Sequence, residues 1–201
     1  MLKESYIKLL NKQSHYNQGN SATKINLHLP VFGAINDFVL KSNRRILEIT
    51  ESEINFSPSS FQIPHITLAM GFIHSIKDYE AICYKISDFA NHLPSLDLTF
   101  EQPYIRKPGN KYVFIDVNPA NKIIKLKKEL NSLIKSDFES VKWDILNEPP
   151  HITIGYINDK QKEIEKEFYQ TPEVTMTVNQ INLSFTGSRG SVLGIIKEFG
   201  K

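Results

Sequence analysis

The sequence predicts an α+β fold made of two duplicated halves, each with the order β-α-β-α-β. The first observation is that the tetrapeptide Pro-His-Ile-Thr occurs twice, at 64–67 and 150–153, and leads each time into an apolar stretch. The second is that the copies lie 86 positions apart, and the same offset places 25–29 on 111–115. Both of these segments alternate and precede a helix-like pattern, so strand, helix and His-x-Thr strand recur in one order and register.

The spacing of apolar residues predicts the elements of the first half. Alternation indicates strands, a spacing of three to four residues indicates helices, and clusters of serine and proline mark loops. Ser75 followed by Asp78 is typical of a helix N-cap. In chain order we expect a strand (25–29), a helix (35–47, with Ser42-Asn43 as a point where it could break), a loop (51–62), the first His-x-Thr strand (from 65), a helix (75–92) and a strand (96–100).

The second half repeats this order and ends in a hairpin, with no interdomain linker before it. A turn at 108–110 separates the halves, and Asn118 with Pro119 is typical of a capped helix start. We expect a strand (111–117), a helix (118–134), a loop (139–149), the second His-x-Thr strand (from 151), a short charged helix (158–171) and two strands (174–185 and 191–199) joined through 187–190.

Length and composition favour a single domain. We place this domain at 24–201, and residues 1–23 form an N-terminal extension whose first turns have the spacing of a short docking helix. With 24 basic and 22 acidic side chains, the net charge of +2 is too balanced to predict duplex-wide nucleic-acid binding. The lone Cys83 fits a core position. No signal-peptide segment and no apolar run of membrane length is present, so we expect a cytoplasmic monomer without a membrane partner.

The two His-x-Thr strands point to acid-base chemistry. Successive side chains of a strand face opposite sides, so His65 and Thr67 share one face, and His151 and Thr153 do the same. Two imidazoles suit in-line displacement at phosphorus, because histidine, with a pKa of about 6.5, can both take and deliver a proton near neutral pH. The threonine hydroxyls can donate hydrogen bonds to the phosphate oxygens. No carboxylate or cysteine accompanies the histidines at ligand spacing, so we expect neither a metal nor another cofactor.

These motifs resemble those of the two-histidine (2H) phosphoesterase superfamily, which includes the RNA ligase-like (LigT) proteins, cyclic phosphodiesterases and 2′,5′-phosphodiesterases. The resemblance rests on His65-Ile66-Thr67-Leu68 and His151-Ile152-Thr153-Ile154 and covers about residues 24–199. It implies a bilobal fold in which antiparallel sheets face a central groove, and metal-independent chemistry. It also implies catalytic roles for His65 and His151, with phosphate contacts from Thr67 and Thr153.

Strand alternation extends the prediction to the lining of the groove. The apolar rows of 25–29 and 113–117 should face the core, which puts Asn26, His28, Tyr112 and Phe114 on the groove side. Tyr112 and Phe114 could stack a base or could form a second small core, and His28 is either a polar contact or a structural residue. Small side chains after each threonine should leave room for a ligand, at Ala69 and Gly155. Further candidates for substrate contact are Trp143 in the loop before the second motif, Arg189 in the last hairpin, and Arg106 or Lys107 near the turn between the halves.

The leading hypothesis is a metal-independent phosphodiesterase. It would cleave cyclic-phosphate nucleotides, or 2′,5′- or 3′,5′-linked and cyclic oligonucleotides, with one histidine as base and the other as acid. RNA-end processing and degradation of signalling nucleotides stay open at this point, as does the assignment of base and acid. The alternative is a module of the same fold that binds a nucleotide or RNA without turnover. A third class, an adaptor with both histidines buried, would have no groove.

Overall fold

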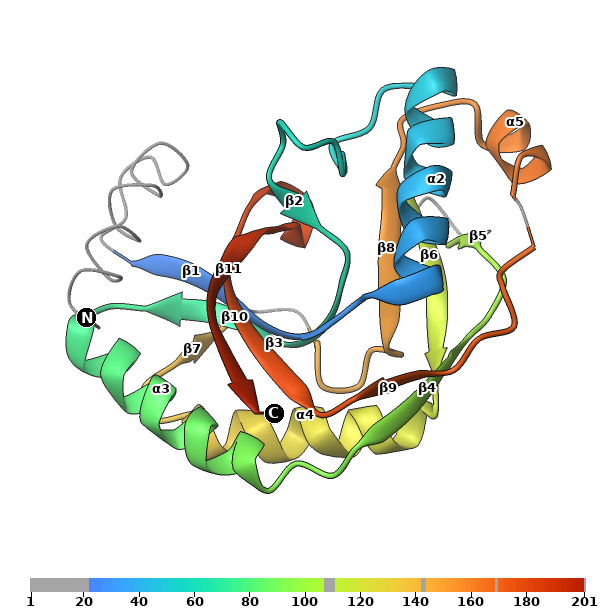
Figure 1. The fold of residues 1–201 in the computed structure, drawn as a ribbon. Helices are drawn as coiled ribbons and strands as arrows, with labels where there is room; N and C mark the ends of the chain where they lie inside the picture. Colours follow the sequence, from blue (N-terminus) through green and yellow to red (C-terminus); the bar gives the residue numbers. More distant parts are fainter. Residues whose placement is uncertain (1–21, 107–110, 142–143, 169, 201) are drawn as a thin grey trace.

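One path of antiparallel strands runs through the described chain (Figure 1). The computed structural model describes residues 22–106, 111–141, 144–168 and 170–200. The strands are β1 (Thr23–Pro30), β2 (Gln62–Ile63), β3 (His65–Ile73), β4 (Leu96–Phe100), β5 (Tyr104–Ile105), β6 (Tyr112–Asn118), β7 (Glu139–Ser140), β8 (His151–Tyr156), β9 (Met176–Val178), β10 (Gln180–Thr186) and β11 (Val192–Gly200). The helices are α2 (Gly33–Ile49), α3 (Ile76–Asn91), α4 (Ala120–Ile134) and α5 (Gln161–Lys166), with a 3-10 turn η1 (Ser188–Gly190).

The sheet divides into two lobes, as expected. The strand order is β2-β11-β10-β1-β3 in the first lobe and β8-β6-β4-β9 in the second. In Figure 1 the first lobe lies to the left and the second to the right, with α3 and α4 along the lower edge. Between the lobes, β3 and β8 share the pair Ile66 and Ile152. The two His-x-Thr motifs therefore lie side by side where the lobes meet.

The internal duplication is visible in the hydrogen-bond register. In the first lobe His28 lies opposite Thr67, and in the second Phe114 lies opposite Thr153, 86 positions later on both strands. Both strand pairs also contain a β-bulge at the same place, directly after the threonine. The repeat inferred from the four-residue motif thus extends through the whole strand pair.

The halves of the sequence exchange strands between the lobes. Strand β4 follows the first half of the chain but pairs with β6 and β9 in the second lobe, whereas β10 pairs with β1 in the first. The segment expected as one strand over 174–185 is consequently two strands, which pair in different lobes. The expected helix over 158–171 is also shorter, because α5 ends at Lys166.

Apolar side chains from both lobes form one core. The inward rows of the central strands and the apolar faces of α2, α3 and α4 belong to a single cluster that includes Cys83, as predicted. The helix α2 runs without a break through Ser42-Asn43, the point at which the sequence allowed one. The reason is that the Asn43 amide donates to the carbonyls of Ile54 and Ile154, so the polar side chain is satisfied without disrupting the helix.

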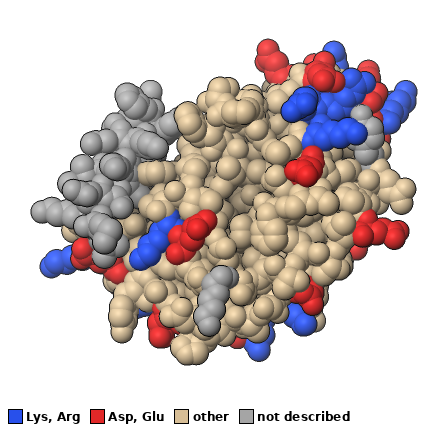
Figure 2. Space-filling model, in the orientation of Figure 1, with Lys and Arg blue, Asp and Glu red and all other residues tan. Residues whose placement is uncertain are grey.

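Charges of both signs are mixed on the surface. In the view of Figure 2, lysines and arginines gather at the upper right, above α2 and α5 of Figure 1, and acidic side chains lie among them. Arg45, for example, pairs with both Glu48 and Glu167. Within the described part of the chain, no helix is long and apolar enough to cross a membrane. Of the extension 1–23, which was expected to contain a docking helix, the structure describes only Ala22 and Thr23, and Thr23 begins β1.

Candidate active site

The strand pairing places the two His-x-Thr motifs on one face. Ile66 and Ile152 lie directly opposite each other and are fully buried, so both point into the core. The residues on either side of each isoleucine must then point to the other face of the sheet. His65, Thr67, His151 and Thr153 are those residues, and all four are partly exposed.

Both imidazoles are held in the same way. His65 Nδ1 lies 3.1 Å from the carbonyl oxygen of Ile63, and His151 Nδ1 lies 2.9 Å from that of Pro149. A carbonyl can only accept, so Nδ1 donates in both rings. In the neutral rings Nε2 therefore carries the free lone pair, which is the tautomer that a general base requires.

The two histidines differ in their electrostatic surroundings. Burial lowers the pKa of His65 to about 4, against the raising effect of the Ile63 and Gly190 backbone and with a further lowering by His151. Burial also lowers the pKa of His151, but the Pro149 carbonyl and the carboxylates of Glu148 and Asp116 oppose the shift. Only His151 thus has acidic neighbours that favour its protonated form.

A pocket of about 520 Å³ opens beside the second motif. It contains six of the predicted residues together with the loop before the second motif, in which only Trp143 was predicted to contact substrate. The lining residues are Arg106, Tyr112, Phe114, Asp144, Asn147, Glu148, Pro149, His151, Thr153 and Arg189. The sequence analysis missed Asp144, Asn147 and Glu148. These residues could have been predicted as site residues, because they are polar and lie in the loop just before a motif strand. Trp143, predicted in the same loop, lies outside the described residues.

Aromatic rings form one wall of this pocket. The Phe114 ring stacks on His151 with a centroid distance of 4.0 Å, and Tyr112 stacks on Phe114 at 5.5 Å. Phe114 is only 4% exposed, whereas Tyr112 is partly exposed and meets Tyr156 edge to face. Phe114 therefore supports the histidine, and Tyr112 offers the more accessible ring to a ligand.

His28 occupies the equivalent of the Phe114 position but is fully buried. Its ring meets His65 edge to face at 5.4 Å, and its Nε2 lies 2.9 Å from the Ser184 hydroxyl. Burial lowers the pKa of His28 to about 3, helped by His65 and opposed by the Leu29 backbone. Of the two alternatives for His28, this burial supports the structural one, with the neutral ring packed behind His65. Asn26 lies beside it and donates to Thr67 Oγ1.

The small residues after each threonine do not face the groove, contrary to expectation. Ala69 is fully buried, and a Cβ atom at Gly155 would lie 3.0 Å from the side chain of Ile46 in α2. The β-bulges cause the error, because an inserted residue reverses the alternation for the rest of the strand. Ala69 and Gly155 thus allow close packing of the core.

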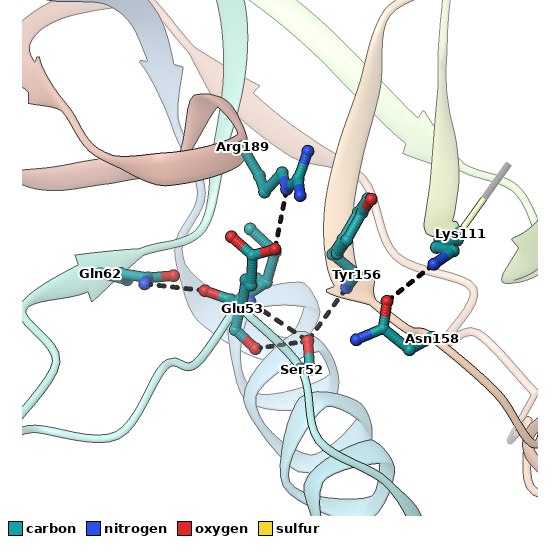
Figure 3. Close-up of polar contacts among 8 residues, drawn as sticks. Ser52, Glu53, Gln62, Lys111, Tyr156, Asn158 and Arg189 are labelled. Atoms are coloured by element: carbon teal, nitrogen blue, oxygen red, sulfur yellow. Dashed lines mark hydrogen bonds and ion pairs between the residues drawn. The ribbon is translucent and has the colours of Figure 1, made fainter.

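Two arginines border the pocket, each paired with a carboxylate. Arg106 pairs with Glu148, and its guanidinium lies 5.8 Å from the Phe114 centroid. Arg189 belongs to the first lobe but contacts Glu53 at 2.9 Å and lies 4.2 Å above the Tyr156 ring of the second lobe (Figure 3). Ser52 accepts from the Tyr156 amide in the same cluster. Arg189 therefore spans the lobes at one end of the pocket.

Comparison with known proteins places this arrangement in a family. A family model described as the 2′-5′ RNA ligase superfamily matches residues 41–186. The chain belongs to this superfamily. The match confirms the predicted two-histidine phosphoesterase family and supports a phosphoesterase-type enzyme. No protein of curated function matches the chain by sequence.

Several solved structures have a similar fold. Apo LigT of E. coli is 15% identical, with a TM-score of 0.58, and the match covers 90% of this chain and 98% of LigT. TT0787 of Thermus thermophilus is 11% identical, with a TM-score of 0.65 and coverages of 88% and 96%. The MHV ns2 PDE domain is 14% identical, with a TM-score of 0.55 and coverages of 81% and 99%. At these identities the likeness confirms the predicted bilobal fold.

Proposed function

We propose that this superfamily member is a metal-independent phosphodiesterase. Its substrates would be nucleotides with a cyclic phosphate, or oligonucleotides with 2′,5′ or 3′,5′ linkages, linear or cyclic. The observation that carries the proposal is the pair of imidazoles on one face, each held through Nδ1 by a backbone carbonyl and each leaving Nε2 for proton transfer. The adjacent hydroxyls of Thr67 and Thr153 would donate to the phosphate oxygens.

The different surroundings of the histidines support a division of roles. His65, whose pKa is lowered to about 4, is neutral near pH 7 and would take the proton from the attacking water or ribose hydroxyl. Burial lowers the pKa of His151, but Glu148 and Asp116 oppose this shift, and the charge of a bound phosphate would also oppose it. Protonated His151 would then deliver its proton to the leaving oxygen as the phosphorus–oxygen bond breaks.

The pocket beside His151 supports a nucleotide as the substrate. The partly exposed Tyr112 ring would stack on a base, and Arg189 and Arg106 would hold phosphate or sugar oxygens after exchanging their carboxylate partners. Solved LigT complexes contain 3′-AMP, ATP and NADP+, which supports nucleotide binding by a protein of the same fold.

A substrate panel tests the proposal. Nucleoside 2′,3′-cyclic phosphates, 2′,5′-oligoadenylate and cyclic di- and trinucleotides would be incubated with the protein and EDTA, and the products separated by chromatography. We expect turnover of one class, with a loss of about 100-fold or more in His65→Ala and in His151→Ala. His92→Ala is the matched control, because this exposed histidine at the end of α3 is remote from both motifs in sequence, and among the contacts described its ring bonds only the Asp88 carbonyl oxygen.

Two outcomes would overturn the proposal. Activity that survives in the double variant would remove the two-histidine mechanism. Tight binding of a nucleotide that stays intact through long incubation would instead favour the non-catalytic binding module.

A further inference from the structure

Each His-x-Thr strand changes phase immediately after its threonine. In β3 the register passes from Thr67 opposite His28 to Ala69 opposite Leu27, so Leu68 is the inserted residue. In β8 it passes from Thr153 to Gly155 in the same way, with Ile154 inserted. Without the insertion, strict alternation would put Ala69 and Gly155 on the face of the threonines.

The bulges therefore make the site and the core compatible. A one-residue change of register moves every later side chain to the opposite face of a strand. With the bulge, the histidine and threonine face the groove while the rest of the strand keeps its buried residues in the core. If the bulge relaxed into a regular ladder, either the histidine and threonine would turn into the core or the later buried residues would turn towards the groove.

A bulge also frees a backbone carbonyl, and in both strands an asparagine amide binds it. Asn43 Nδ2 lies 2.8 Å from the Ile154 oxygen, and Asn131 Nδ2 lies 3.2 Å from the Leu68 oxygen. An unpaired buried carbonyl would cost about 1–3 kcal/mol, so these bonds stabilise the bulged form against the regular one. Asn43 also donates to Ile54 and accepts from the Phe56 amide, which fixes the loop that follows α2.

The two contacts cross between the halves of the chain. Asn43 lies on α2 in the first half and binds the bulge of the second motif, whereas Asn131 lies on α4 in the second half and binds the bulge of the first. The helices pack accordingly, α2 against β8 and α4 against β3. The asparagines are 88 positions apart, not 86, so they do not occupy equivalent positions of the repeat. Equivalent carbonyls are nevertheless bound in both halves.

We propose that Asn43 and Asn131 are positioning residues, each of which fixes the bulge that aims the His-x-Thr motif contributed by the other half. Asn43 acts on His151 and Thr153, and Asn131 acts on His65 and Thr67. The kinetic part of this inference rests on the proposed phosphodiesterase function, whereas the structural part does not.

The titration of individual histidine rings tests the crossed pattern without any substrate. Asn43→Ala and Asn131→Ala would be compared with the wild type by 15N NMR of the imidazoles across pH, with ring signals assigned from His65→Ala and His151→Ala. We expect Asn43→Ala to shift the titration or tautomer signals of His151 and leave those of His65, and Asn131→Ala to do the reverse. Urea unfolding would measure the stability of each variant.

Neighbouring serines provide matched controls. Ser42 is buried on the same helix, and its hydroxyl has no hydrogen-bond partner in the part of the chain that the structure describes; Ser132 is exposed beside Asn131. Ser42→Ala and Ser132→Ala should leave both rings unchanged. Asn131 is only partly buried, so Asn131→Ala keeps the test valid if Asn43→Ala does not fold. Asn131→Asp, which has the same shape but no amide donor, should behave like Asn131→Ala.

Kinetics then separate positioning from stability. With the substrate found by the panel, we expect kcat to fall about 10-fold or more in the asparagine variants while KM changes little, because misplaced reacting groups affect the chemical step. Ring signals that change equally at both histidines, or at neither, would overturn the positioning role. An active double histidine variant would overturn the proposed function alone, because the crossed NMR pattern could still be observed.

Discussion

The buried His28 makes the stability of the protein depend on pH. Its pKa is lowered to about 3 in the folded state by burial, whereas in the unfolded chain it is about 6.5. Between pH 6.5 and pH 3 the unfolded state therefore binds about one proton more than the folded state at this residue. Its contribution to stability is fully present above pH 6.5 and is lost progressively as the pH falls towards 3.

The size of the effect follows from the two pKa values. Between them the free energy of unfolding falls by about 1.4 kcal/mol per pH unit, so His28 alone should remove about 2 kcal/mol between pH 8 and pH 5. This is a large share of the 5–15 kcal/mol typical of a domain, as an order-of-magnitude range. Acidification to pH 5 should accordingly lower the urea midpoint clearly.

The contribution of His28 to this pH dependence can be isolated by urea unfolding of the wild type and of His28→Gln at pH 8 and pH 5. Glutamine does not titrate and can still hydrogen-bond to the Ser184 hydroxyl that His28 contacts. The difference in unfolding free energy between the two proteins should change by about 2 kcal/mol from pH 8 to pH 5, in favour of the variant at low pH. Parallel pH dependences of the two proteins would refute the assignment of His28 as a neutral buried ring.

Two further substitutions test the packing and the electrostatics of the site. Gly71→Ala should lower the free energy of unfolding in urea by about 1–3 kcal/mol, because the new Cβ atom would overlap the carbonyl oxygen of Glu139 in the paired strand. An unchanged free energy of unfolding would contradict this packing. Lys127→Met should raise the pKa of His151, because the buried ammonium of Lys127 lowers it. If His151 is the acid, the basic limb of the kcat/KM pH profile should move to higher pH, since that limb reports the pKa of the acid. A shift to lower pH would contradict His151 as the acid.

The sequence predicted side-chain directions correctly where the strands alternate regularly. Alternation around Thr67 and Thr153 correctly predicted that both motifs face away from the core, because side-chain direction in a strand depends only on parity. The same rule failed at Ala69 and Gly155, because a bulge changes the parity. Such a bulge cannot be recognised from a run of apolar residues in the sequence. The sequence left the role of His28 open between a polar contact and a structural residue, because the Ser184 that contacts it lies on a strand from the other half of the chain.

The differences between the repeats explain how one duplicated frame can assign two roles. Asp116 lies opposite His151, and the equivalent position opposite His65 is Pro30. Glu148, the other carboxylate that raises the pKa of His151, corresponds by the offset of 86 to the uncharged Gln62. The duplicated backbone thus holds both histidine rings in the same tautomer, with Nδ1 donating to a carbonyl. The two positions at which the repeats differ, Asp116 and Glu148, place negative charge near His151 alone. Because opposite charge favours a protonated imidazole, these two differences would favour His151 as the proposed acid and leave His65 as the proposed base.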